Sequence, residues 1–155
     1  MPAEVHSAAL TGGCLCGAVR FSCDEPPSLV SYCHCRMCQK QTGAPFSVMA
    51  NFSRDALKWS GKPRKLRRSS PLAVRGFCAD CGSPLSFEYG DSDHISVSVG
   101  ALDHPQRVTP TQHGGIESKI PWVTIDEHLP AERVDDDPDY RALLRQTGWK
   151  PPRWE

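Results

Sequence analysis

Cysteine spacing restricts how this chain can fold more than any other feature of its sequence. Seven of the eight cysteines fall into three short clusters, which read Cys14-Leu15-Cys16, Cys33-His34-Cys35-Arg36-Met37-Cys38 and Cys78-Ala79-Asp80-Cys81. Side chains two residues apart share one face of an extended chain, and a tight turn brings the sulfurs of a C-x2-C pair together. Gly82 follows Cys81 and supplies the backbone freedom that such turns favour. The spacing therefore predicts metal binding by thiolates.

Length and composition place the clusters in a single domain in a reducing compartment. A chain of 155 residues buries enough surface to fold as one domain, here residues 1–155, without cross-links to rescue a small core. No apolar run is long enough to span a membrane, and the N-terminus lacks the features of a signal peptide. We therefore expect a cytoplasmic protein with no membrane partner, whose thiols bind metal rather than form disulfides. A formal net charge of zero argues against nucleic acid as the main partner.

The number of clustered cysteines predicts two different metal sites. A closed structural zinc takes four protein ligands, whereas a catalytic zinc takes three and keeps one position open. Seven ligands divide into four from the remote pairs, Cys14, Cys16, Cys78 and Cys81, and three from the local cluster, Cys33, Cys35 and Cys38. Thiolate-rich sites suit zinc or iron-sulfur chemistry, and these spacings match neither ferredoxin pattern. Two ions per chain are therefore expected, one structural and one at an active site.

Two further residues could close the second site and make it structural. Cys23 ends a predicted strand, where a cysteine is more often a small buried apolar residue. His34 lies between Cys33 and Cys35, so on an extended chain it points to the opposite face. We expect both residues to pack or to form hydrogen bonds rather than to bind metal, but the spacing alone leaves them as alternatives.

Short, β-rich segments bounded by turn residues dominate the rest of the sequence. The clearest strand is 94–99, where Ile95, Val97 and Val99 alternate with serines. Gly12-Gly13 reads as a turn, and helices are expected only over 36–42 and 138–146, the second followed by a loose tail. The fold class is thus mostly β. Further strands are expected at 17–23, 29–33, 46–52, 57–60, 65–69, 73–77 and 85–89.

Charge is unevenly distributed along the balanced chain. Residues 62–75 contain six basic side chains and no acidic one, whereas residues 126–139 are strongly acidic. Both stretches are typical of solvated faces. The basic stretch is also a candidate for holding an anionic small molecule, while its lack of interleaved aromatic residues argues against nucleic acid.

Several motifs resemble those of the glutathione-dependent formaldehyde-activating (GFA) family, which is related to centromere protein V. The resemblance covers about residues 12–129 and rests on GGCLCGAVRF at 12–21, CHCRMCQKQTG at 33–43, FCADCGSPL at 77–85 and SKIPW at 118–122. It implies a β-tent fold of small antiparallel sheets, zinc-stabilised, with the same division of the cysteines into four and three ligands. Residues 138–155 would form a C-terminal helix and tail.

The resemblance implies a carbon-sulfur lyase that joins glutathione and formaldehyde as S-(hydroxymethyl)glutathione. A glutathione sulfur could then occupy the open position beside Cys33, Cys35 and Cys38, the implied catalytic residues. Three thiolates make the zinc a poor Lewis acid, so nearby cations are needed to offset the negative charge. Candidate substrate-binding residues are Arg36, Gln39, Lys40 and Lys119, with the basic stretch over 62–68 as a further candidate. Trp122 is expected in the core.

Two other functions compete with the lyase. A non-catalytic zinc module would use both metals structurally and bind a protein or nucleic-acid partner. A zinc-dependent hydrolase would need a general base near the metal, and the sequence contains no His-Glu-x-x-His pairing to supply it. A fourth protein ligand at the second site would exclude the lyase.

Overall fold

Two β-sheets form the body of the protein. The structure is a computed structural model and describes residues 9–153. The strands are β1 (Leu10–Gly13), β2 (Val19–Cys23), β3 (Leu29–Cys33), β4 (Ser47–Ser53), β5 (Leu57–Gly61), β6 (Lys65–Arg68), β7 (Ala73–Phe77), β8 (Pro84–Tyr89), β9 (His94–Ser98) and β10 (Gln112–Gly114). The α-helices are α1 (Arg36–Thr42) and α2 (Pro138–Thr147), and four 3-10 turns occupy Val99–Ala101, Pro105–Arg107, Ile116–Ser118 and Val134–Asp136. The expected fold class, mostly β, is confirmed.

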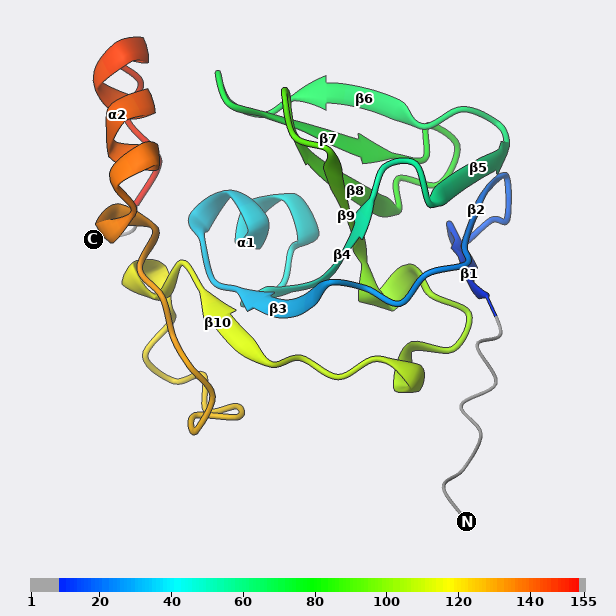
Figure 1. Cartoon of the computed structure of the whole chain (residues 1–155), viewed down its shortest axis with the longest axis horizontal. Helices are drawn as coiled ribbons and strands as arrows, with labels where there is room; N and C mark the ends of the chain where they lie inside the picture. The colour runs from blue at the N-terminus through cyan, green and yellow to red at the C-terminus, as the bar shows by residue number, and fades with distance from the viewer. Residues whose placement is uncertain (1–8, 154–155) are drawn as a thin grey trace.

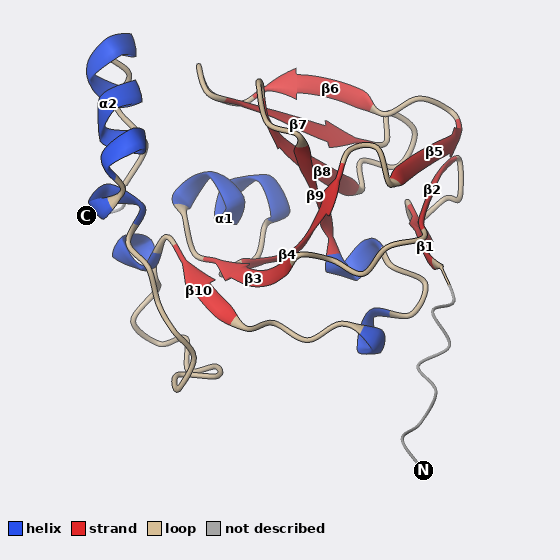
Figure 2. Cartoon of the chain, in the orientation of Figure 1, coloured by secondary structure: helices blue, strands red, loops and turns tan. Residues whose placement is uncertain are grey.

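The two sheets differ in size and lie at an angle to each other. A three-stranded sheet has the order β1-β2-β5, and a seven-stranded sheet has the order β10-β3-β4-β9-β8-β7-β6. All neighbouring strands are antiparallel except β10, which pairs parallel to β3. Helix α1 lies against the larger sheet, and α2 stands at the opposite end of the molecule from the smaller one (Figure 1 and Figure 2).

The hydrophobic core fills the space between the two sheets because β1, β2, β3, β4, β5 and β9 each place apolar side chains on one face. In β9, Ile95 and Val97 are buried and alternate with polar residues, as the sequence predicts. Phe21 and Cys23 from β2 pack with Phe52 from β4 in the same cluster. Cys23 therefore serves as a small apolar core residue, in line with the expectation for it.

The segment expected to turn at Gly12-Gly13 is a strand. Gly12 and Gly13 pair with Phe21 and Arg20 of β2. Glycine is needed at position 12 because a Cβ atom there would lie 2.4 Å from both the Ala101 carbonyl oxygen and the Phe21 ring. Close approach of the backbone, rather than a turn, explains this glycine.

Both expected helices are present, with caps that fix their ends. Helix α1 ends at Gly43, whose φ of 71° suits glycine, and α2 begins after Asp137, whose carboxylate accepts from the Asp139 and Tyr140 backbone N–H groups. The chain after α2 is not loose over the described residues, because Arg153 pairs with Asp135 at 2.5 Å. Within residues 9–153 no helix has the length and apolar character needed to cross a membrane.

Candidate metal centres

The four remote cysteines meet at one end of the molecule. Cys14 and Cys16 follow β1, and Cys78 and Cys81 form the turn between β7 and β8. The sulfurs of Cys14 and Cys16 lie 3.6 Å apart, and those of Cys16 and Cys78 lie 3.8 Å apart. These distances are far longer than the ~2.05 Å of a disulfide.

The geometry of this cluster fits a tetrahedral zinc ion. Four thiolates at ~2.3 Å from a central zinc are separated by about 3.8 Å, which matches the observed spacing. Leu85 and Val19 pack around Cys14 and Cys78 and keep this side of the cluster dry. Four converging thiols, two of them buried, suit a closed structural site.

The second cluster lies where β3 meets α1. Cys33 ends β3, Cys35 caps the N-terminus of α1 through a hydrogen bond from the Cys38 backbone N–H to its sulfur, and Cys38 lies one turn into the helix. The three sulfurs lie within 4.8 Å of one another. Among residues 9–153, no further His, Cys, Asp or Glu ligand atom joins this group. Three thiols without a fourth protein ligand in the described chain suit the zinc of a site with an open position.

His34 is the residue that holds the second cluster in place. Its side chain is fully buried, and its Nε2 lies 2.8 Å from Nδ1 of His113. The His113 Nε2 lies 3.0 Å from the Asp126 carbonyl oxygen, which can only accept. His113 therefore donates through Nε2, so His34 donates through Nε2 to His113. Burial lowers the pKa of His34 to about 4, which keeps the ring neutral at pH 7.

This arrangement confirms that His34 points away from the cysteine sulfurs and forms a hydrogen bond. A loop residue that the sequence did not single out supports the same site from another side. Gly115 has a φ of 63°, and a Cβ atom there would lie 3.0 Å from the Cys35 backbone nitrogen. The loop after β10 can therefore pack against Cys35 only with glycine at this position.

Arg75 supplies a buried positive charge to the second cluster. The Nη1 and Nη2 atoms of this β7 residue both lie 3.5 Å from the Cys38 sulfur, and its guanidinium group packs on the Phe87 ring at 4.9 Å. Only 6% of Arg75 is exposed. Hydrogen bonds from the Cys33 and Cys35 thiols, together with the Arg75 charge, lower the pKa of Cys38 well below its usual range. Arg75 and Cys38 are thus an ion pair when the thiol is ionised.

Sequence reasoning missed this role of Arg75. The residue belongs to the basic stretch 62–75, but no motif distinguishes it from the other five cations there. Its strand pairing is the missing information, because β7 lies between β6 and β8 and directs Arg75 toward α1. A guanidinium group buried against a thiolate is the kind of contact that only long-range pairing creates.

The structure places three of the four expected substrate-binding residues around one shallow cavity of about 390 Å³. Arg36, Gln39 and Lys40 line it together with Trp122, which is 70% exposed, so the expectation that Trp122 lies in the core is wrong. Gln39 is buried, and its amide bonds to the carbonyl oxygens of His34 and Ser118 and accepts from Arg36.

Lys119, the fourth of these residues, lies apart from that cavity wall. It forms an ion pair with Glu127 at 3.4 Å. Lys40 is exposed and has no ion-pair partner among residues 9–153, and Arg36 donates only to the neutral Gln39 amide, so these two of the four residues keep a positive charge for a ligand.

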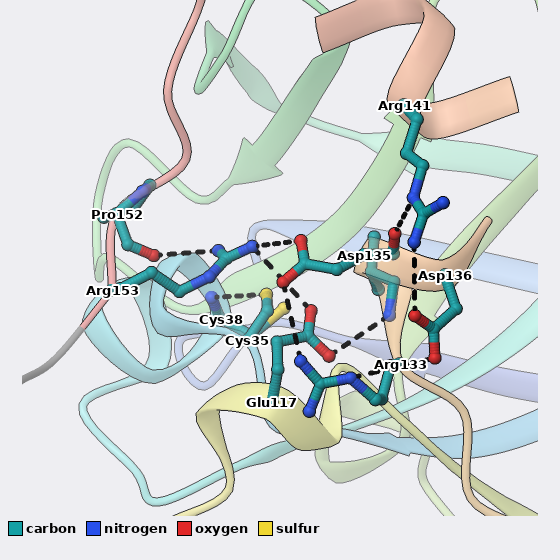
Figure 3. A network of polar contacts seen from close by, with 10 residues as sticks. Cys35, Cys38, Glu117, Arg133, Asp135, Asp136, Arg141, Pro152 and Arg153 are labelled. Atoms are coloured by element: carbon teal, nitrogen blue, oxygen red, sulfur yellow. Dashed lines mark hydrogen bonds and ion pairs between the residues drawn. The ribbon is translucent and has the colours of Figure 1, made fainter. Parts of the chain in front are cut away.

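A polar network from the C-terminal part of the chain lies near the second cluster. Glu117 accepts from the Val134 backbone N–H, and Arg153 connects Glu117 with Asp135 (Figure 3). The same view includes Cys35 and Cys38 of the second cluster. The network fixes the C-terminal segment beside this end of the molecule.

Comparison with known proteins identifies a family and two relatives. The model of the glutathione-dependent formaldehyde-activating enzyme family matches residues 9–117, more than half of the chain. A Schizosaccharomyces pombe protein named an uncharacterized lyase is 27% identical over 136 residues, which cover 88% of this chain and 86% of that protein. A Halomonas elongata protein named for glutathione-dependent formaldehyde activation is 28% identical over 131 residues, covering 76% and 81%.

A solved structure shares the fold. The crystal structure of a Rhodobacter sphaeroides protein superposes with a TM-score of 0.52 at 22% identity, covering 64% of this chain and 91% of that one. The matched segment 9–117 contains all seven clustered cysteines, His34 and Arg75. The chain therefore belongs to the glutathione-dependent formaldehyde-activating enzyme family.

Proposed function

We propose that this protein is a zinc-dependent carbon-sulfur lyase acting on glutathione or a related thiol and its formaldehyde adduct. The observation that carries the proposal is the second cluster, in which Cys33, Cys35 and Cys38 converge without a fourth protein ligand among the described residues. Family membership and the names of the two relatives support the same class of reaction. In the synthetic direction, the thiol sulfur forms a bond to the formaldehyde carbon, and the thiol proton ends on the aldehyde oxygen.

A fourth thiolate can bind favourably at the second cluster only if positive groups neutralise the negative charge of the three cysteine thiolates. When bound, zinc supplies the positive charge that keeps a coordinating thiol in its thiolate form. Three cysteine thiolates and a divalent ion sum to one negative charge. Arg75 brings this sum to zero through its contacts with Cys38. An incoming thiolate thus meets a site without net negative charge.

The side chains around the second cluster are held rigidly, which favours orientation of the two reactants as the main contribution to the reaction rate. Cys33 and Cys35 flank His34, which the His113 ring holds from behind. Holding a thiolate in the correct orientation beside an aldehyde makes a bimolecular reaction effectively unimolecular. Because the proposed chemistry needs reduced thiols, we place the protein in the cytoplasm. The competing proposal of a non-catalytic zinc module predicts no saturable binding of a small thiol.

Metal analysis followed by calorimetry tests the proposal. The purified protein should contain two zinc ions, and glutathione titrated into it should bind with one site per chain. The Cys35→Ser variant should retain one zinc and lose glutathione binding, whereas Cys23→Ser, which changes a core cysteine outside both clusters, should retain both properties. Glutathione binding by a Cys35→Ser protein that has lost its second zinc would contradict the proposal.

A further inference from the structure

A cavity between α1 and the β6-β7 hairpin carries an excess of positive charge, of which only Arg75 contacts a cysteine cluster. It has a volume of about 560 Å³, within the range typical of small-molecule sites. Its walls include Lys40 from α1, Arg67 from β6 and Arg75 from β7, with Met37 and Phe77 as apolar surface. Among residues 9–153, no aspartate or glutamate lines it. The cavity therefore suits an anion that also carries apolar or neutral atoms.

The pairing of β6 with β7 creates an unfavourable contact that an anion would relieve. Arg67 and Arg75 lie directly opposite each other in the antiparallel register. Like charges at opposite positions of a strand pair destabilise it. The Cys38 sulfur offsets Arg75 from one side. Arg67 has no ion pair or hydrogen bond with any part of residues 9–153, so its charge is available to a ligand.

Most other basic residues of the same stretch have a protein partner, and Lys65, which has none in the described chain, does not line the cavity. Lys62 pairs with Asp80 at 2.7 Å, and Arg64 pairs with Glu88 at 2.7 Å. Arg68 donates to the Pro71 carbonyl oxygen at 3.1 Å and, as the next residue along β6, lies on the other face of the strand. Arg67 is thus the one cation of this hairpin that lines the cavity without a protein partner in the described chain.

We propose that this cavity binds a carboxylate of the thiol ligand, with Arg67 and Lys40 as its specificity-determining cations. Arg75 lines the cavity and also contacts the Cys38 sulfur, so the cavity is adjacent to the second cluster, and the proposed ligand would extend from one to the other. The inference rests on the proposed function and deepens it, because it selects thiols that carry a carboxylate some distance from the sulfur. Glutathione has two such groups, whereas small neutral thiols have none.

The test compares charged and uncharged ligands on matched variants of the two-zinc protein. Arg67→Met removes the proposed contact and keeps an unbranched, flexible stem, and Arg68→Met removes the same charge from the other face of β6. Calorimetric titration with glutathione should show about tenfold weaker binding for Arg67→Met and Lys40→Met, since each loses one charge-assisted hydrogen bond. Arg68→Met should bind as the unchanged protein does. Glutathione diethyl ester should bind weakly to all four proteins.

Equal losses in Arg67→Met and Arg68→Met would indicate only a general effect of charge and would overturn the inference. Tight binding of the diethyl ester would also overturn the inference. The same conclusion would follow if phosphate bound to the cavity without competing with glutathione. Circular dichroism and melting temperature check that the variants fold. If a variant fails to fold, Arg67→Gln replaces Arg67→Met, with the same expected loss.

S-methylglutathione separates this inference from the proposed function, because it keeps both carboxylates and cannot supply a thiolate. If it binds as tightly as glutathione and loses affinity in Arg67→Met, the cavity assignment stands and the thiolate assignment fails. If glutathione binds tightly in both Arg67→Met and the unchanged protein and S-methylglutathione does not bind, the reverse holds. If neither glutathione nor S-methylglutathione binds, both the cavity assignment and the thiolate assignment are contradicted.

Discussion

Replacing Cys81 with serine should remove the structural zinc and with it a large part of the stability of the fold. The zinc would connect two segments 62 residues apart, as measured between Cys16 and Cys78. Treated as a cross-link, closure of a loop of this length is worth about 4 kcal/mol through the lower entropy of the unfolded chain. A domain of this size is stable by only ~5–15 kcal/mol. Loss of the ion should therefore cost roughly a third of the available stability or more.

Urea unfolding and metal analysis on the same samples measure this effect. We expect Cys81→Ser to hold one zinc and to unfold at a much lower urea concentration than the unchanged protein. The matched control is Cys23→Ser, because Cys23 is 2% exposed and donates only to the Glu25 carbonyl oxygen, a bond that a serine hydroxyl can replace. This control should keep two zinc ions and lose about 1 kcal/mol.

Two outcomes would refute this reasoning about the four-cysteine cluster. A Cys81→Ser protein with two zinc ions and an unchanged midpoint would show that Cys81 is not a structural ligand. A Cys81→Ser protein that loses one zinc without loss of stability would show that the ion does not cross-link the fold. Chelator added to the unchanged protein should lower the midpoint as the substitution does.

Three further predictions concern the second cluster and the buried ion pairs. Cys35→Ser should lose one zinc by metal analysis while its melting temperature falls less than that of Cys81→Ser, because Cys33, Cys35 and Cys38 are close in sequence and close no long loop. Arg75→Met should weaken glutathione binding at least tenfold in calorimetry and Arg75→Lys by less, and equal affinities in the two variants would count against charge compensation. Burial of Glu88 would by itself raise its pKa, but hydrogen bonds from Arg64 and Arg54 outweigh this and lower it. The ionised form of Glu88 therefore stabilises the fold above pH ~4.5, and this contribution is lost as pH falls through the folded-state pKa. We expect Glu88→Gln to lower the free energy of unfolding by roughly 3 kcal/mol at pH 7. In urea unfolding, this cost should shrink as the pH is lowered toward 3.

The sequence predicted which cysteines come together because the spacing within each cluster is local and the count of seven ligands suggests how the clusters combine. The C-x-C and C-x2-C spacings set the direction of the sulfurs within each pair, and the ligand count, rather than any local signal, joined the two pairs that are 62 residues apart. The orientation of His34 follows from its place between Cys33 and Cys35. The alternation of Ile95 and Val97 likewise predicted β9 without information from the rest of the chain.

Features that depend on contacts between distant segments escaped sequence reasoning. Gly12 looked like a turn residue because nothing local shows that the Ala101 carbonyl oxygen approaches it. The parallel pairing of β10 with β3 joins segments about 80 residues apart and has no hairpin signal between them. Trp122 looked like a core residue by composition, yet it lies at the rim of a shallow cavity.

The basic stretch 62–75 shows how pairing gives different roles to residues that look alike in sequence. Strand alternation and register direct Arg64 to Glu88, Arg67 to the cavity and Arg75 to Cys38. At the second cluster the counter-charge must persist at any pH at which the thiolates exist. A guanidinium group meets this requirement because it does not lose its proton in proteins, whereas a buried lysine or histidine would. Arginine at position 75 thus keeps the charge of the site constant while a thiol binds and leaves.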